Sequence, residues 1–275
     1  MSTLGKVDVP GAQEASQEVQ RARLRLLDIN VRFGGIVALD GVTLDAAAGE
    51  VLGIIGPNGA GKTTLFDVIA GVRRPSRGRI ELDGRDVTRS SSSVRARLGL
   101  RRTFQRVQTF GWLTVEDNIL AALEWRGGGG GFVGDVVAWP ARRRRERHRR
   151  ERVAEVLDQC GLASVRDQLA GSLPIGASRM AELGRALADR PSILLLDEPA
   201  SGLDHDELTR LGQQIRRARD EAGCTVLLVE HNAQFVMEQC DRIVVLDQGR
   251  VLATGTPAEI QSNALVREAY LGDVA

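Results

Sequence analysis

The clearest chemistry in this chain lies in a glycine-rich stretch that ends in Lys-Thr-Thr. Glycines let a backbone turn tightly and bring successive N–H groups close to an anion. The lysine then offers a positive charge to β and γ phosphates, and the following hydroxyl can bind Mg²⁺. The pattern G-x-x-x-x-G-K-[ST] therefore predicts binding of a nucleoside triphosphate with Mg²⁺. The residues are Gly56, Pro57, Asn58, Gly59, Ala60, Gly61, Lys62, Thr63 and Thr64.

The elements on both sides of this stretch support the same prediction. The apolar run 51–55 predicts a short buried strand, and residues 63–70 predict a helix. A helix begins with its positive dipole end, which would point at the bound phosphates. A glycine-rich turn without a function needs neither this strand-helix frame nor the Lys-Thr pair.

Further polar residues follow predicted strands. Asp197 and Glu198 follow an apolar strand, so that one carboxylate could hold Mg²⁺ and the other could polarise an attacking water. Gln105 and His231 also stand at strand ends. Each has an ordinary alternative when taken alone, since acidic residues end many strands, glutamine is usually a surface residue and a single histidine is usually structural.

The elements that must position these residues alternate between strands and helices. Such alternation predicts a parallel sheet covered on both faces. Ahead of it, strands expected at 24–33, 42–46 and 79–82 indicate a small β subdomain, with 42–46 and 51–55 interpreted as an antiparallel pair. The remaining expected strands are 99–104, 193–196, 225–229 and 242–246, and the expected helices are 114–123, 178–188, 206–222, 232–240 and two short ones within 257–271.

The composition limits the class of protein. The 275 residues carry 37 Lys and Arg against 36 Asp and Glu, which gives no general attraction for nucleic acid. Cys160, Cys224 and Cys240 lack C-x-x-C spacing, which favours buried thiols in a reducing compartment over disulfides or zinc. No apolar run approaches the roughly 18 residues of a membrane span. Residues 1–20 are polar and are expected to form a flexible extension rather than a signal peptide.

One region stands apart in composition. Residues 127–131 are five consecutive glycines, and residues 142–152 are strongly basic. We expect disorder or a flexible hairpin at the five glycines, within a Gly-rich and basic insertion over about 126–152. The basic run continues into Val153, Val156 and Leu157 at helical spacing, so it is either the solvated face of a helix or a contact with membrane head groups or a partner.

The motifs together resemble the nucleotide-binding subunit of ATP-binding cassette (ABC) transporters, from about residue 24 to residue 271. The family motifs follow in order as Walker A at 56–63, the Q-loop at Gln105, the signature at 173–177, Walker B at 193–198, the D-loop at 201–204 and the H-loop at His231. The stretches RFGGIVALDGV, GPNGAGKTTLFDVIAG, RRTFQ, LTVEDNI and ATGTPAEI look like the branched-chain (hydrophobic) amino-acid uptake subfamily.

This resemblance implies an α/β fold with a P-loop NTPase core and parallel sheet, an antiparallel β subdomain and a helical subdomain. Residues 21–275 would form the nucleotide-binding domain, with the helical subdomain at about 106–190. The chain would hydrolyse ATP with Mg²⁺ to power import of branched-chain or other hydrophobic amino acids. Its partners would be two membrane permease subunits, a second ABC ATPase subunit and, indirectly, a solute-binding protein, and not nucleic acid. It would lie at the cytoplasmic face of the cell membrane as a peripheral subunit.

The resemblance also implies roles for single residues. Glu198 would act as general base or orient water, Gln105 would reach the metal and the lytic water, and His231 would hold the γ-phosphate. Asp197 and Thr63 would bind the Mg²⁺ shell.

Three further roles concern the rim of the site and the second ATPase subunit. Phe33 would stack on adenine, and Asp204 would signal across the dimer. Gly176, in the signature, would face the nucleotide of the other subunit.

The signature departs from the family pattern. The common sequence is Leu-Ser-Gly-Gly-Gln, but here it is Leu173-Pro174-Ile175-Gly176-Ala177. Pro174 lacks the serine hydroxyl and a backbone N–H, and Ala177 lacks the amide. We therefore hypothesise that the chain supports its partner's nucleotide site poorly while its own Walker A site remains competent.

Other functions share many of these motifs. The ATPase could serve another ABC system, such as urea or amide uptake or lipid or lipopolysaccharide export, or it could be a weakly catalytic regulatory subunit. Soluble ABC ATPases of DNA repair or translation fit less well, because the chain has neither a heptad stretch nor a second cassette.

Overall fold

Two β-sheets of different character make up most of the core of the computed structural model, which describes residues 22–103, 105, 107–124 and 139–268. The first is antiparallel, with strand order β2-β1-β4-β5. The second has the order β10-β9-β3-β8-β7-β6 and carries the nucleotide-binding motifs. The first sheet contains β1 (Ala22–Phe33), β2 (Ile36–Ala47), β4 (Arg77–Leu82) and β5 (Arg85–Asp86).

The second sheet is buried on both faces. Its central strands pair in parallel, and their residues alternate between two hydrophobic clusters, one on each face. Continuous apolar strands are typical of a sheet covered on both sides. Its members are β3 (Val51–Ile55), β6 (Leu100–Arg102), β7 (Ile193–Asp197), β8 (Thr225–Val229), β9 (Arg242–Asp247) and β10 (Arg250–Gly255).

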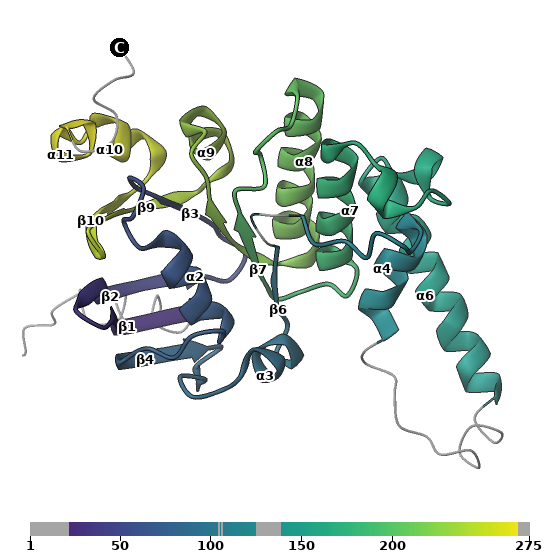
Figure 1. Cartoon of the computed structure of the whole chain (residues 1–275), viewed down its shortest axis with the longest axis horizontal. Helices are drawn as coiled ribbons and strands as arrows, with labels where there is room; N and C mark the ends of the chain where they lie inside the picture. The colour runs from purple at the N-terminus through teal and green to yellow at the C-terminus, as the bar shows by residue number, and fades with distance from the viewer. Residues whose placement is uncertain (1–21, 104, 106, 125–138, 269–275) are drawn as a thin grey trace, which may run out of the picture.

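Helices cover this sheet, and α2 (Lys62–Ala70) lies between the two sheets (Figure 1). The other face packs against α7 (Ile175–Leu187), α8 (His205–Ala222) and α9 (Ala233–Gln239). A helical subdomain contains α4 (Val115–Glu124), α6 (Trp139–Gln159), the 3-10 turns η1 (Ala163–Val165) and η2 (Ala170–Ser172), and α7. The short helices are α3 (Ser92–Arg97), α10 (Pro257–Ser262) and α11 (Ala264–Val266).

The predicted antiparallel pairing of 42–46 with 51–55 is wrong. β2 pairs with β1, whereas β3 pairs in parallel with β8 and β9. The turn between β2 and β3 therefore carries the chain from one sheet to the other. Burial explains the difference, because β2 alternates between buried and exposed residues whereas all five residues of β3 are buried.

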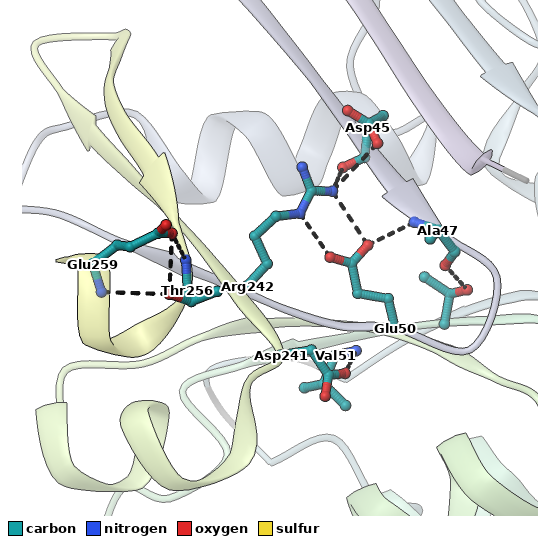
Figure 2. Close-up of polar contacts among 9 residues, drawn as sticks. Asp45, Ala47, Glu50, Val51, Asp241, Arg242, Thr256 and Glu259 are labelled. Carbon is teal, nitrogen blue, oxygen red and sulfur yellow. Dashed lines mark hydrogen bonds and ion pairs between the residues drawn. The ribbon is translucent and has the colours of Figure 1, made fainter. Parts of the chain in front are cut away.

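A polar cluster fixes this passage between the sheets (Figure 2). The Arg242 guanidinium, at the start of β9, donates to the Glu50 carboxylate at 2.7 Å and to the main-chain carbonyl of Asp45 at 2.7 Å. Glu50 in turn accepts the main-chain N–H of Ala47 at 2.6 Å. These bonds tie both sheets to the turn at the end of β3 that is remote from the glycine-rich loop.

Other expectations differ in detail. The helix expected at 178–188 begins three residues earlier, at Ile175, so the signature forms its first turn. β10, antiparallel to β9, was not expected because its residues are mostly half-exposed. Residues 1–20 and the glycines 127–131 lie outside the described residues, whereas the basic run 142–152 lies within the long helix α6.

The three cysteines are free and buried, as expected. Burial raises the pKa of each of these thiols to about 12, so that they remain protonated. They act as small apolar side chains in the core.

The cluster at the sheet junction gives a stability prediction. Replacement of Arg242 by Met should lower the free energy of unfolding by about 2 kcal/mol, because the buried Glu50 loses its charged partner. Arg250→Met is the matched control, since Arg250 pairs with Asp40 in solvent, and it should cost less than about 1 kcal/mol. Urea unfolding measures both, and equal losses would contradict the assignment.

Candidate active site

The glycine-rich loop joins β3 to α2 in a conformation that requires its glycines. Gly56, Gly59 and Gly61 all have positive φ values, of 150°, 83° and 102°. A Cβ atom on Gly56 would lie 2.0 Å from the carbonyl oxygen of Leu246, and one on Gly61 would lie 2.6 Å from that of Ala38. Side chains are therefore excluded where the loop packs against its neighbours.

Lys62 begins α2 and turns back into this loop. Its ammonium donates to the carbonyl oxygens of Gly56 at 2.7 Å and Pro57 at 2.9 Å. Burial lowers the pKa of Lys62, while the nearby charges of Glu198 and Asp197 act in the opposite direction. The loop thus holds a positive charge beside its backbone, as the recognition of a polyphosphate requires.

Arg95 holds the other end of α2. Its fully buried guanidinium donates to the carbonyl oxygens of Val68 at 2.6 Å and Ile69 at 2.8 Å, and to that of Val87 at 2.8 Å. Burial lowers its pKa to about 10. A cation at the C-terminus of a helix also interacts favourably with the helix dipole. Sequence reasoning missed this residue, because an arginine in a short polar segment gives no sign of burial.

Asp197 ends β7 and is nearly inaccessible to solvent, with 3% of its surface exposed. Arg102, at the end of β6, donates to Asp197 at 3.1 Å and to Asp67 of α2 at 2.6 Å. Burial raises the pKa of Asp197, and the hydrogen bond from Arg102 opposes that shift. Arg102 therefore links the Walker B strand to the helix that follows the phosphate loop, and no sequence motif predicted this link.

The three residues predicted to surround the reacting atoms lie together. The Glu198 carboxylate accepts a hydrogen bond from the Gln105 amide at 3.0 Å and lies 2.9 Å from Nε2 of His231. Glu198 has a φ of 50°, in the left-handed region, and its N–H donates to the carbonyl of Val229 in β8. A carboxylate held by two polar side chains is suited to accept a proton from water.

Glu230, one residue before His231, holds the loops that follow β7 and β8. It is buried and accepts the main-chain N–H groups of Ala200 at 2.6 Å and His231 at 3.0 Å. Burial raises the pKa of Glu230, while these hydrogen bonds lower it. This residue was not predicted, although a carboxylate next to a strand-end histidine was a visible signal.

The segment around Gln105 is also tied to α7. The Arg179 guanidinium donates to the carbonyl of Gln105 at 3.4 Å, and the Glu182 carboxylate accepts the N–H of Gln108 at 3.3 Å. Movement of α7 would therefore be transmitted directly to Gln105, which contacts Glu198.

Gly176 and Asp204 form a second group through Glu207. Asp204 caps α8 by accepting the N–H of Glu207 at 2.8 Å, and Glu207 completes the capping box. A Cβ atom on Gly176 would lie 1.7 Å from the Glu207 carboxylate, so a side chain there would displace Glu207 from the capping box. Pro174 stands at the N-cap of α7 without a side-chain cap, and Ile175 is 53% exposed.

Phe33 ends β1 with 41% of its surface exposed. The guanidinium carbon of Arg73 lies 4.2 Å from the ring centroid on one face. Stacking of this ring on adenine stays a prediction.

Comparison with known proteins identifies the family. The family model described as ABC transporter matches residues 39–201, and a second, described as branched-chain amino acid ATP-binding cassette transporter, matches residues 250–275. The chain is 40% identical to BraF, the high-affinity branched-chain amino acid transport ATP-binding protein of Pseudomonas aeruginosa, over 93% of this chain and 100% of BraF. It is 39% identical to LivG of Escherichia coli, which carries the same description, over 90% of this chain and 98% of LivG.

Solved structures agree with the fold. A nucleotide-free ATP-binding cassette from an ABC transporter superposes with a TM-score of 0.78 at 30% identity, covering 92% of this chain and all of that one. An ADP-bound cassette gives a TM-score of 0.77 at 28% identity, covering 92% of this chain and 99% of that one. The predicted α/β fold class is thus confirmed, and the chain belongs to the ATP-binding subunits of ABC transporters.

Proposed function

We propose that this chain is the ATP-hydrolysing subunit of an importer for branched-chain or other hydrophobic amino acids. The names of BraF and LivG support this substrate class, as does the family match at residues 250–275. The observation that carries the catalytic part is the contact of Gln105 and His231 with the Glu198 carboxylate.

The mechanism follows from the positions of these groups. Backbone N–H groups of the glycine-rich loop bind the β and γ phosphates. The Lys62 ammonium binds them too, and it gives up its hydrogen bonds to the carbonyls of Gly56 and Pro57. Glu198 accepts the proton of a water that attacks the γ-phosphorus in line with the departing ADP. Gln105 and His231 both orient the Glu198 carboxylate. Gln105 also binds the attacking water, and His231 binds the γ-phosphate.

The donors beside the loop fit Mg²⁺. Asp197, the Thr63 hydroxyl and the Gln105 carbonyl are hard oxygen ligands, which Mg²⁺ prefers in combination with substrate phosphates. Bound there, Mg²⁺ neutralises charge on the phosphates. Arg102 keeps the buried Asp197 carboxylate oriented before the metal binds.

The rim of the site is assigned to adenine and to a second ATPase subunit. Phe33, which is 41% exposed, would stack on adenine, while Gly176 and Asp204, at the N-termini of α7 and α8, would bind or sense the nucleotide of the other subunit. Each nucleotide would then lie between the Walker A loop of one subunit and the signature of the other.

Membrane partners would dock beside the Q-loop. Phe110 and Trp112 are 41% and 77% exposed, their ring centroids lie 6.1 Å apart, and Leu169 is 51% exposed. Exposed apolar groups gathered in this way mark interaction surfaces. We assign the surface to one of two permease subunits, which would place the chain at the cytoplasmic face of the membrane and connect it indirectly to a solute-binding protein.

No helix among the described residues has the length and apolar character of a membrane span.

Two substitutions test the catalytic assignment. Lys62→Ala should abolish ATP binding, because the loop loses its only side-chain cation for the phosphates. Glu198→Gln should keep ATP bound and reduce turnover by at least about 100-fold, since the amide cannot accept the proton. Equilibrium binding of a fluorescent ATP analogue and phosphate release measure the two effects. Glu221→Gln, an exposed carboxylate on α8, is the control, and full turnover in Glu198→Gln would refute the proposed base.

The signature gives a prediction about asymmetry. Each lost charge-assisted hydrogen bond weakens binding by about 1.5–3 kcal/mol, or tenfold or more. In a complex with a related ATPase of intact signature, Glu198→Gln in this chain should therefore remove most turnover. Replacement of the corresponding glutamate in the partner should remove little. The double change Pro174→Ser with Ala177→Gln should raise turnover at the partner's site, and equal contributions from both sites would contradict the hypothesis.

The transport system itself can be identified by copurification. Capture of the tagged chain from detergent extract should bring down permeases whose bound solute-binding protein recognises branched-chain amino acids. Recovery of lipopolysaccharide export components instead would refute the importer assignment.

A further inference from the structure

Positive charge in this protein is concentrated in one helix. Residues 142–152, within α6, contain eight arginines and two glutamates, which gives this segment a net charge of +6 with its histidine neutral. The whole chain has a net charge of only +1, so the remaining residues carry a net charge of −5. The concentration of positive charge in this one segment therefore needs an explanation.

The stability of α6 does not explain this concentration of arginines. These arginines follow one another along α6, where like charges at i,i+3 and i,i+4 spacing repel and weaken the helix. Among the described side chains of this segment, Arg150 pairs with Glu146 at 2.9 Å and Arg152 with Glu155 at 2.8 Å, which offsets only part of the repulsion. A cluster of like charges that opposes its own helix indicates an anionic partner outside the chain.

Residues 142–152, the basic half of α6, are placed where such a partner can reach them. The C-terminal half of α6 is anchored, because Val153, Val156 and Leu157 are buried in the core. The basic half extends past the end of α4, away from the two sheets (Figure 1). Arg144, Arg147 and Arg150 are exposed there.

We propose that this basic half of α6 docks on the anionic phospholipid surface of the membrane. Guanidinium groups bind phosphate oxygens in bidentate fashion, and basic helices are drawn to anionic lipid head groups. A projecting helix can touch a flat membrane while the net-negative remainder of the chain stays away from it. The net charge of −5 on the remaining residues would also repel a nucleic acid duplex, which is too long to touch α6 alone. The inference rests on the proposed function only in so far as that function brings the chain to a membrane.

The experiment is cosedimentation of the full chain with vesicles of phosphatidylcholine, alone or mixed equally with phosphatidylglycerol. The chain should bind the anionic vesicles only. Combined Arg144→Gln, Arg147→Gln and Arg150→Gln should reduce the partition coefficient on the order of 100-fold, since each arginine contributes about equally to the attraction. Glutamine has a helix propensity close to that of arginine, so circular dichroism and ATP hydrolysis should not change.

A matched triple variant removes the same charge elsewhere. Arg74, Arg85 and Arg89 are exposed on or near the antiparallel sheet, and their joint replacement by Gln should leave most of the vesicle binding. Equal losses in the two triple variants would overturn the proposal, as would equal binding of the wild type to neutral vesicles. So would binding of a duplex oligonucleotide without binding of anionic vesicles.

The Lys62→Ala variant separates this inference from the proposed function. This variant should lose ATP binding and keep its affinity for anionic vesicles, because Lys62 is buried at the start of α2 and is not part of α6. If it keeps ATP while the α6 variant still loses vesicle binding, the ATPase assignment fails and the lipid contact stands.

Discussion

The parallel register of β3, β8 and β7 is the constraint on which the site depends. Ile54 and Asp197 both pair with Val229, so the three strands end at the same level of the sheet. The glycine-rich loop follows β3, Glu198 follows β7, and Glu230 and His231 follow β8. Segments more than a hundred residues apart in the sequence thereby meet at one edge, where ligands bind in open α/β sheets.

Buried charges then fix the site within that edge. Arg102 joins Asp197 to α2, Glu230 joins the loops after β7 and β8, and Arg95 holds the C-terminus of α2. Buried ionic groups are expensive to desolvate and rarely serve stability alone. Arg102 connects α2, which follows the glycine-rich loop, to the strand that carries Asp197, and Glu230 connects the loops that carry Glu198 and His231.

Sequence reasoning found the groups that act through their own chemistry. Lys62 and Glu198 were predicted from their type and position, and Gln105 and His231 from the resemblance to the family; the structure brings Gln105, Glu198 and His231 into contact. It missed Arg95 and Arg102, whose roles come from long-range contacts that no local pattern encodes, and it missed Glu230 although its place beside His231 was a visible signal. The wrong pairing of β2 with β3 has the same origin, because a short turn does not specify which strand is the neighbour. Burial on both faces of β3 was the better guide.

The central claim is that the backbone amides of the loop and one ammonium group hold the triphosphate beside Glu198. A structure of the Glu198→Gln variant with ATP and Mg²⁺ tests it most directly. We expect the Lys62 ammonium to leave the carbonyls of Gly56 and Pro57 and to lie within hydrogen-bond reach, about 3 Å, of β and γ phosphate oxygens. Nucleotide bound elsewhere, with Lys62 still on those two carbonyls, would contradict the account.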